Sequence, residues 1–132
     1  MTIEILIVDD DPEILEIMRL DFEDQPSFVV DTCGSSSAAL EKTRAHQYDV
    51  IITDWRMPLM NGTQLIRSLR AGGCRSYIIL YSGHTISSDI RSALDGGADH
   101  VIHRAGDPDA EFAELRQEIR HAAGAGDGQV QQ

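Results

Sequence analysis

The sequence has few cysteines and no long hydrophobic run. Its two cysteines, Cys33 and Cys74, stand far apart without C-x-x-C or other metal-type spacing, which favours free thiols in a reducing compartment. No apolar run approaches the length that crosses a bilayer. The N-terminus also lacks the basic and apolar regions of a signal peptide. We therefore expect a cytoplasmic domain without membrane insertion.

Positive charge is scarce as well. Lys and Arg number 11 against 22 Asp and Glu, a net charge of -11. Because phosphate backbones attract positive charge, this balance argues against direct binding of nucleic acid. No stretch matches the nucleotide-binding pattern G-x-x-x-x-G-K-[ST]. The loop after the first apolar run reads "DDDPE", which would repel the phosphate of a flavin.

What the sequence does contain is a regular alternation of segments over 132 residues, a length that fits one domain. Short apolar runs predict strands at 3–8, 28–33, 49–54, 77–82 and 99–103, and helical periodicity predicts helices at 12–24, 36–46, 63–71, 86–95 and 108–123. Strands that are apolar on both faces belong inside a sheet covered on both sides. We therefore predict an α/β fold, a doubly wound five-stranded parallel sheet in a three-layer sandwich.

Two of the expected helices carry apolar residues at helical spacing. In the first, this spacing joins Ile14, Leu15, Ile17, Met18 and Phe22. In the last, the apolar stripe comprises Phe112, Leu115 and Ile119. Such spacing is typical of helices that pack on a sheet.

Polar side chains stand at the carboxyl ends of the expected strands, where ligands bind in doubly wound folds. They are Asp9, Asp10 and Asp11 after the first strand, Asp54 at the third, Ser82 at the fourth and Arg104 after the fifth. Asp11 and Asp107 each precede a proline at the start of an expected helix, so both are interpreted as N-caps.

The carboxylates of Asp9, Asp10 and Asp54 are not explained by capping. At ~4 Å and an effective dielectric of about 20, each pair would cost roughly 4 kcal/mol. A divalent cation would offset that repulsion, and Mg²⁺ is held by one or two carboxylates together with waters and phosphate oxygens. Alternatively, one or more of the acids is protonated or directed into solvent. The residues alone leave both interpretations open.

Across residues 3–122 the chain resembles the receiver domain of two-component response regulators. The resemblance rests on "ILIVDDDPEI", "DVIITDWRMPLMNG", "ILYSG" and "GGADHVIHR", which occur in the family's order and at its spacing. The closing "RAGDPDAEFAELRQEI" is similar to a variant common in archaeal receivers attached to sensor histidine kinases. The resemblance implies a flavodoxin-like strand order of 2-1-3-4-5. It also implies a receiver domain over 1–123, with 124–132 as a flexible tail or the start of a linker.

The same resemblance implies a role for each residue at the strand ends. Asp54 would accept a phosphoryl group from the phosphohistidine of a sensor histidine kinase or phosphotransfer protein. Asp9, Asp10, Asp54 and the backbone carbonyl of Arg56 would hold Mg²⁺, and Ser82 would bond a phosphoryl oxygen. Phosphorylation would switch a protein-interaction surface. The chain would not be an enzyme acting on a separate substrate, and its fourth helix, fifth strand and last helix would offer a homodimer face.

Three residues depart from the family's pattern. Arg104 stands where the family has lysine, and arginine is not equivalent to lysine at phosphate; a register shift of one would place His103 there instead. Ala105 replaces a proline that follows a cis bond. Because a cis bond before a non-proline residue costs about 3–4 kcal/mol, we predict a trans 104–105 peptide. Val101 replaces the family's aromatic switch residue.

These departures favour a second hypothesis, a pseudo-receiver that acts as a phosphorylation-independent protein-interaction module. The intact acidic residues oppose it. A hydrolase that forms an acyl phosphate would need a second acid at the position of Arg56, so that class of enzyme is set aside. His84 lies two positions after Ser82, where side chains of the family can tune loss of the phosphoryl group; a solvated side chain is the alternative.

Overall fold

Strands and helices alternate along the whole of the described chain. The computed structural model describes the backbone of residues 1–84 and 86–131 and the side chains of residues 1–84 and 86–124. The elements are β1 (Ile3–Val8), α1 (Pro12–Glu23), β2 (Phe28–Cys33), α2 (Ser36–Ala45), β3 (Val50–Thr53), α3 (Gly62–Ala71), β4 (Tyr77–Ser82), α4 (Ser87–Gly96), β5 (His100–His103) and α5 (Pro108–Gln131). Each element corresponds to one predicted from the sequence.

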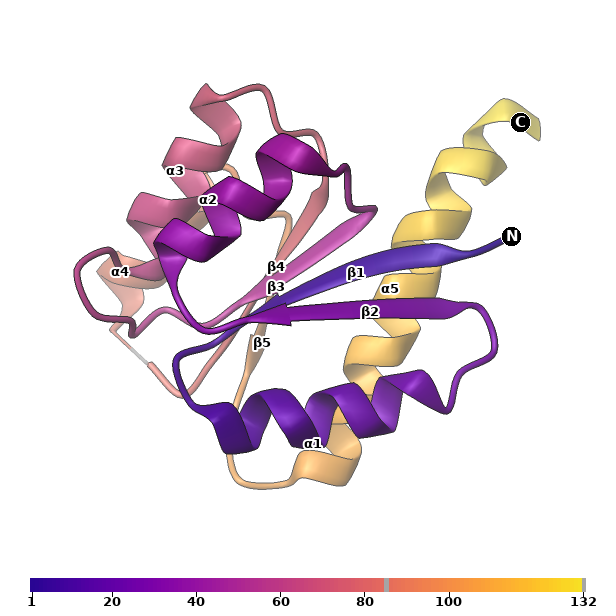
Figure 1. The fold of residues 1–132 in the computed structure, drawn as a ribbon, viewed down its shortest axis with the longest axis horizontal. Coiled ribbons are helices and arrows are strands. Elements are labelled where there is room, and N and C mark those ends of the chain that lie inside the picture. The colour runs from indigo at the N-terminus through magenta and orange to yellow at the C-terminus, as the bar shows by residue number, and fades with distance from the viewer. Residues whose placement is uncertain (85, 132) are drawn as a thin grey trace.

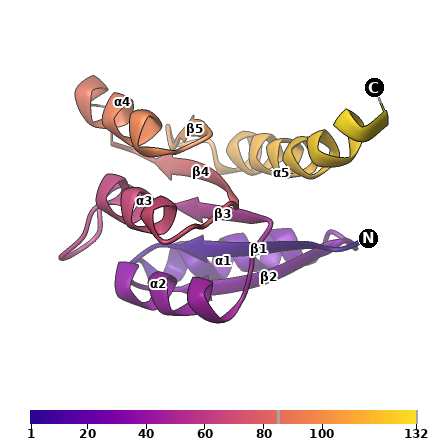
Figure 2. The ribbon, with the colours of Figure 1, turned by 90° about the horizontal axis from the view of Figure 1, so that it is seen from above.

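The five strands form one parallel sheet in the order β2-β1-β3-β4-β5. Helices α1 and α5 cover one face, and α2, α3 and α4 cover the other (Figures 1 and 2). The predicted three-layer fold and its strand order are thus confirmed. Because all strands run the same way, the carboxyl ends of β1, β3, β4 and β5 lie along one edge of the sheet.

The core has two layers because the strands bury both of their faces. In β1, Ile5 and Ile7 pack with residues of α1 and α5, whereas Leu6 and Val8 pack with residues of α2, α3 and α4. All four side chains are fully buried. The interior of the sheet therefore holds its strand ends rigidly in register.

Side-chain caps define the starts of α1 and α5. Asp11 Oδ1 accepts a hydrogen bond from the Glu13 N–H at 2.9 Å, with a proline in the first turn. Asp107 Oδ1 accepts one from the Ala110 N–H at 3.3 Å. Both predicted N-caps are confirmed.

Helix α5 is longer than the sequence predicts. Helix α5 continues to Gln131, through most of the segment expected to be a tail, while Gln132 lies outside the described residues. The division of the chain at residue 123 stays a prediction.

None of the described helices combines the length and hydropathy needed to cross a membrane.

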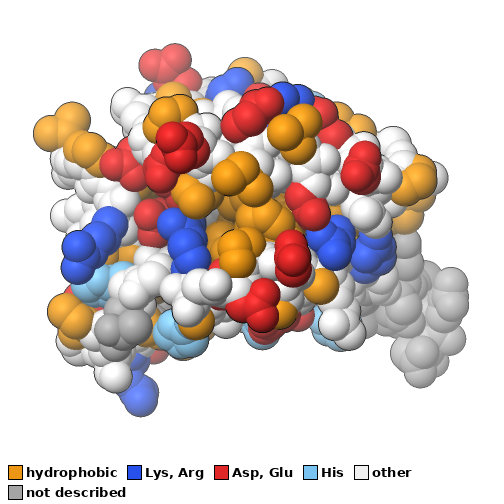
Figure 3. Space-filling view, turned by 90° about the horizontal axis from the view of Figure 1, so that it is seen from below, with side chains coloured by type: hydrophobic (Ala, Val, Ile, Leu, Met, Phe, Trp, Pro, Cys, Tyr) orange, Lys and Arg blue, Asp and Glu red, His pale blue; other side chains and the backbone are white. Residues whose placement is uncertain are grey.

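The expected apolar stripe of α1 is only partly buried. Met18 and Phe22 are buried, but Ile17 is 50% exposed, because adjacent positions point about 100° apart around a helix and cannot both face the sheet. Leu20 is exposed as well. Figure 3, which views the face that carries α1 and α5, shows hydrophobic side chains gathered amid charged ones.

Gly62, the first residue of α3, packs closely against the backbone of Asp54 and Trp55, which follows β3. A Cβ at this position would lie 2.6 Å from the carbonyl oxygen of Asp54 and 2.9 Å from the Cα of Trp55. Gly62→Ala is therefore expected to lower the free energy of unfolding by about 1–3 kcal/mol, because backbone atoms cannot rotate away as a side chain can. Urea denaturation would measure the loss. Gly72→Ala is the matched control, since its Cβ would meet nothing closer than 3.5 Å; equal losses in the two variants would contradict the prediction.

Candidate functional site

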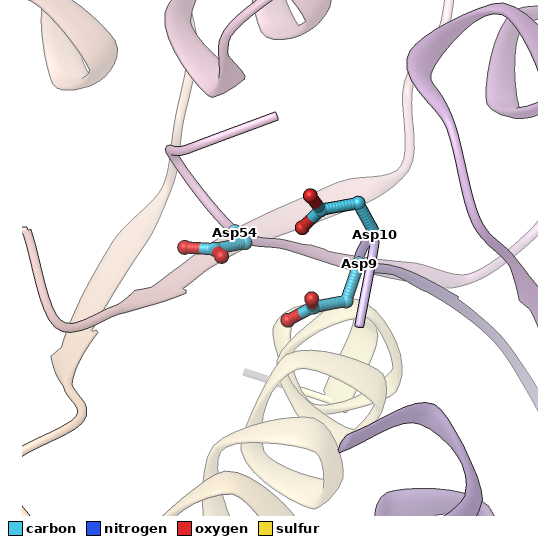
Figure 4. A group of neighbouring side chains, drawn as sticks. All are labelled: Asp9, Asp10 and Asp54. Atoms are coloured by element: carbon cyan, nitrogen blue, oxygen red, sulfur yellow. The ribbon is translucent and has the colours of Figure 1, made fainter. Parts of the chain in front are cut away.

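Three carboxylates meet at the carboxyl edge of the sheet. Val8 of β1 pairs with Thr53 of β3, so Asp9, Asp10 and Asp54 follow neighbouring strand ends. One ligand oxygen of each lies within 4.8 Å of those of the others, and the side chains project into a common space (Figure 4). Asp9 is 2% exposed and Asp54 is 9% exposed, whereas Asp10 is open to solvent.

Backbone groups hold one oxygen of each buried carboxylate. Asp54 Oδ1 accepts a hydrogen bond from the Trp55 N–H at 2.7 Å, and Asp9 Oδ1 accepts one from the Asp11 N–H at 2.9 Å. The Asp54 N–H donates to the carbonyl oxygen of Val8 at 3.2 Å, which ties the acid to β1. Within the described part of the chain, Asp54 Oδ2 has no hydrogen-bond partner and remains available to a ligand.

Charge accumulation in this cluster is unfavourable without a cation. Burial raises the pKa of Asp9, and the negative charge of Asp54 raises it further. Hydrogen bonds from the Asp11 N–H and from Arg104, together with the positive charge of Arg104, lower the pKa of Asp9 but do not offset the rise. Hard oxygen ligands of this kind suit Mg²⁺ or Ca²⁺, so the residues present fit a divalent cation.

Arg104 supplies positive charge to the cluster from the end of β5. Its Nη2 donates to Asp9 Oδ2 at 3.0 Å and to the carbonyl oxygen of Tyr81 at 3.3 Å. Its Cζ lies 4.6 Å from the centroid of the Tyr81 ring. Arg104 rather than His103, which is exposed, therefore reaches the carboxylates. The described residues contain no cis peptide bond, so the predicted trans peptide between Arg104 and Ala105 is confirmed.

Ser82 is the last residue of β4, and His84 lies on the loop that follows this strand. Ser82 is buried, and its Oγ accepts a hydrogen bond from the His84 N–H at 3.1 Å. The His84 ring stacks on Trp55, with 3.9 Å between centroids and an angle of 6°, and its Nε2 lies 2.6 Å from Asp89 Oδ2. Because His84 is buried, the interpretation of it as a solvated side chain is wrong. Among the described residues no hydrogen bond joins Ser82 to Asp54.

Sequence reasoning missed Tyr81 and Glu111, which lie beside Arg104. The Tyr81 hydroxyl donates to Glu111 Oε1 at 2.7 Å, and both residues are buried. The one signal in the sequence is the position of Glu111 in the first turn of the last helix, four residues after the cap Asp107. Acidic residues are common there because they favour the helix dipole, so the signal is weak.

Comparison with known proteins places these features in a family. The family model described as the response regulator receiver domain matches residues 5–118. The transcriptional regulatory protein KdpE of Mycobacterium tuberculosis is 33% identical over 121 residues, which cover 92% of this chain and 53% of that protein. The nitrate/nitrite response regulator protein NarP of Escherichia coli is 31% identical over 114 residues, 86% of this chain and 53% of that protein. The chain thus spans about half the length of these curated relatives.

Solved structures agree with that assignment in their fold. The response regulator domain of Thermotoga maritima CheB has a TM-score of 0.84 at 25% identity, covering 92% of this chain and 96% of that one. A CheY-like response regulator receiver domain protein from Methanospirillum hungatei has a TM-score of 0.83 at 22% identity, covering 95% and 99%. The arrangement of strand ends is therefore shared by receivers whose sequences have diverged widely.

Asp9→Asn tests the charge balance of the cluster. An acid with a raised pKa holds its proton more tightly in the folded than in the unfolded chain. The stability that protonated Asp9 gives to the folded chain is fully present below the ordinary pKa of 3.8. It is lost as the pH rises through the raised pKa, because the buried carboxylate then becomes charged. Without divalent cations, the variant should therefore gain stability relative to the wild type as the pH rises above the ordinary pKa of 3.8.

Urea denaturation in EDTA at several pH values would measure that gain. Asp10→Asn, which alters an exposed carboxylate of the same cluster, is the matched control and should show a smaller pH-dependent difference. A difference between Asp9→Asn and wild type that does not change with pH would contradict the prediction.

Proposed function

The chain belongs to the response regulator receiver domain family, and from that membership we propose that it is the phosphoacceptor module of a two-component system. Asp54 is the acceptor. The observation that carries this assignment is its placement, with Asp54 nearly buried beside Asp9 and Asp10 and with one oxygen held by a backbone N–H and the other available. The phosphoryl donor is the phosphohistidine of a sensor histidine kinase or phosphotransfer protein. No separate substrate is turned over, so the module is not an enzyme in the usual sense.

The chemistry asks for positioning and for charge neutralisation more than for a strong nucleophile. Asp54 Oδ2 forms a bond to phosphorus while the phosphorus–nitrogen bond to the donor's imidazole breaks, and the electron pair of that bond stays on the ring nitrogen. The hydrogen bond from the Trp55 N–H to Asp54 Oδ1 keeps the carboxylate oriented during transfer. Burial of Asp54 limits access by water to the acyl phosphate that results.

Mg²⁺ is the cation proposed for the carboxylate cluster. Asp9, Asp10, Asp54 and the backbone carbonyl of Arg56 would hold it, and when bound it neutralises charge shared by the acceptor and the phosphoryl oxygens. Arg104 adds its own positive charge. In the structure the guanidinium donates to Asp9, and its planar fork is suited to turn towards two phosphoryl oxygens.

Ser82 is proposed to report the new charge. Its hydroxyl oxygen accepts a hydrogen bond from the His84 N–H, which leaves its own proton to donate to a phosphoryl oxygen. Movement of this serine would alter the loop that leads to α4. The α4–β5–α5 face, which carries the exposed Leu94 and the partly buried Val101, is the proposed output surface and homodimer interface.

One observation favours the pseudo-receiver as a second candidate. The ion pair between Arg104 and Asp9, 3.0 Å long, already supplies a cation to the cluster from within the chain. If that pair were permanent, neither a metal ion nor a phosphoryl group would be needed to hold the loops in place. The chain would then present its α4–β5–α5 face constitutively.

The fluorescence of Trp55, the single tryptophan, distinguishes these two functions. Trp55 directly follows Asp54 in the chain, and its indole stacks on His84. We therefore predict a saturable change in fluorescence on titration with Mg²⁺ and a second change on addition of beryllofluoride, which mimics a phosphoryl group. Asp54→Asn should abolish the second change. Absence of both changes in the wild type would contradict the phosphoacceptor function and support the pseudo-receiver.

Arg104→Ala distinguishes the ion pair of Arg104 with Asp9 from its proposed contact with the phosphoryl group. Removing the guanidinium frees Asp9 for a metal ion, so Mg²⁺ should bind at least as tightly as in the wild type. Beryllofluoride should bind about 10- to 100-fold more weakly, because a charge-assisted hydrogen bond contributes roughly 1.5–3 kcal/mol. Both affinities come from Trp55 fluorescence. Arg91→Ala, in the helix α4, is an exposed control; equal effects of the two variants would contradict the assignment of Arg104.

A further inference from the structure

The loop between β5 and α5 is held by one buried carboxylate. Glu111 Oε2 accepts hydrogen bonds from three successive backbone N–H groups, those of Ala105 at 2.6 Å, Gly106 at 3.1 Å and Asp107 at 3.2 Å. The side chain is 6% exposed. Burial alone would raise the pKa of Glu111, but these bonds together with the one from Tyr81 hold that pKa below its usual value. Glu111 is therefore a stable buried anion at neutral pH.

The backbone of this loop is shaped to receive that anion. Gly106 has a φ of +107°, a conformation that L-residues rarely adopt. The turn it makes allows neighbouring N–H groups to converge on one point, as in the anion-binding nests formed by successive amides. The carboxylate comes from the first turn of α5, where negative charge is also favoured by the helix dipole.

The same carboxylate fixes the surroundings of Arg104. The other oxygen of Glu111, Oε1, accepts from the Tyr81 hydroxyl at 2.7 Å. The ring of Tyr81 lies under the guanidinium of Arg104, and the carbonyl oxygen of Tyr81 accepts from Arg104 Nη2 at 3.3 Å. Glu111 thus accepts hydrogen bonds from the hydroxyl of Tyr81, whose ring lies beneath Arg104, and from the three backbone N–H groups that directly follow Arg104.

We propose that Glu111 is a positioning residue of the phosphoryl site, which orients the Arg104 guanidinium by holding the Tyr81 ring and the 105–107 backbone in place. The proposal rests on the proposed phosphoacceptor function. Ala105 lacks the ring that would restrict the backbone here, and the Glu111 carboxylate supplies that restriction through hydrogen bonds. Glu111 acts through Arg104 and does not itself touch the reacting atoms.

A matched pair elsewhere in the molecule separates positioning from simple attachment of α5 to the sheet. Tyr77, at the start of β4, donates its hydroxyl to Glu118 Oε2 of α5 at 2.5 Å. This pair joins the same strand to the same helix near the opposite end of the strand, away from Arg104. A residue that only fastens α5 should behave like Glu118, whereas a positioning residue should affect binding at Asp54.

The experiment measures beryllofluoride affinity at saturating Mg²⁺ through Trp55 fluorescence, with thermal unfolding recorded for each variant. Glu111→Ala should weaken binding about tenfold, the loss expected when one good hydrogen-bonded contact is no longer oriented. Glu111→Gln keeps a carbonyl oxygen for the loop and an amide for Tyr81, so it should restore affinity to within about threefold of wild type. Glu118→Ala should change affinity less than about twofold, whatever its effect on stability.

The route through Arg104 is tested by a double-mutant cycle. In an Arg104→Ala background, Glu111→Ala should cause little further loss of beryllofluoride affinity, because the group that it positions is already absent. Tyr81→Phe, which removes only the hydroxyl, gives a milder variant should Glu111→Ala not fold. It should weaken binding in the Arg104 background and have no effect in the Arg104→Ala background.

The outcomes are distinguishable. Failure of the wild type itself to bind beryllofluoride overturns the proposed function and this proposal with it. Binding by the wild type with equal affinities for Glu111→Ala and Glu118→Ala overturns only the positioning role. An undiminished effect of Glu111→Ala, or of Tyr81→Phe, in the Arg104→Ala background does the same.

Discussion

Repulsion between like charges at the end of two paired strands is the constraint on which the rest of this molecule depends. Parallel pairing of β1 with β3 brings Asp9 beside Asp54, and the sheet that buries them also raises the pKa of Asp9. Positive charge must therefore be supplied from elsewhere. Arg104 brings it from β5, and Tyr81 and Glu111 in turn surround that arginine, so a chain of contacts connects the acids to the start of α5.

Arg104 has one guanidinium for two partners, the carboxylate of Asp9 and the proposed phosphoryl group. Its guanidinium neutralises Asp9 in the structure, and in the proposed function it turns to the phosphoryl group. In that function the two partners would compete for the same donor, so the stability that the ion pair gives to the loops and the affinity for a phosphoryl group would be opposed quantities. Natural variation at this position between arginine and lysine would shift that balance, because the two cations differ in shape and in hydration.

The fold was predictable because its signals are local. Apolar runs, helical spacing and the caps Asp11 and Asp107 each act over a few residues, and they locate the strand ends that gather Asp9 and Asp54. The half-exposed Ile17 was not predictable, since spacing alone does not say which of two adjacent apolar residues meets the sheet. The hydrogen bonds of Glu111 were missed because its partners come together only in the tertiary fold. These partners are Tyr81, 30 residues away in the chain, and three backbone N–H groups.

The start of α4 differs from the other helix starts described above. Its N-cap, Ile86, has no side chain that can accept a backbone hydrogen bond, and the acidic residue of its first turn, Asp89, bonds instead to His84. His84 in turn stacks on Trp55. Local fraying of this helix end is therefore thermodynamically linked to the environment of the indole. Opening of the first turn of α4 would therefore change the surroundings of the indole next to Asp54 without any rigid-body shift of the helix.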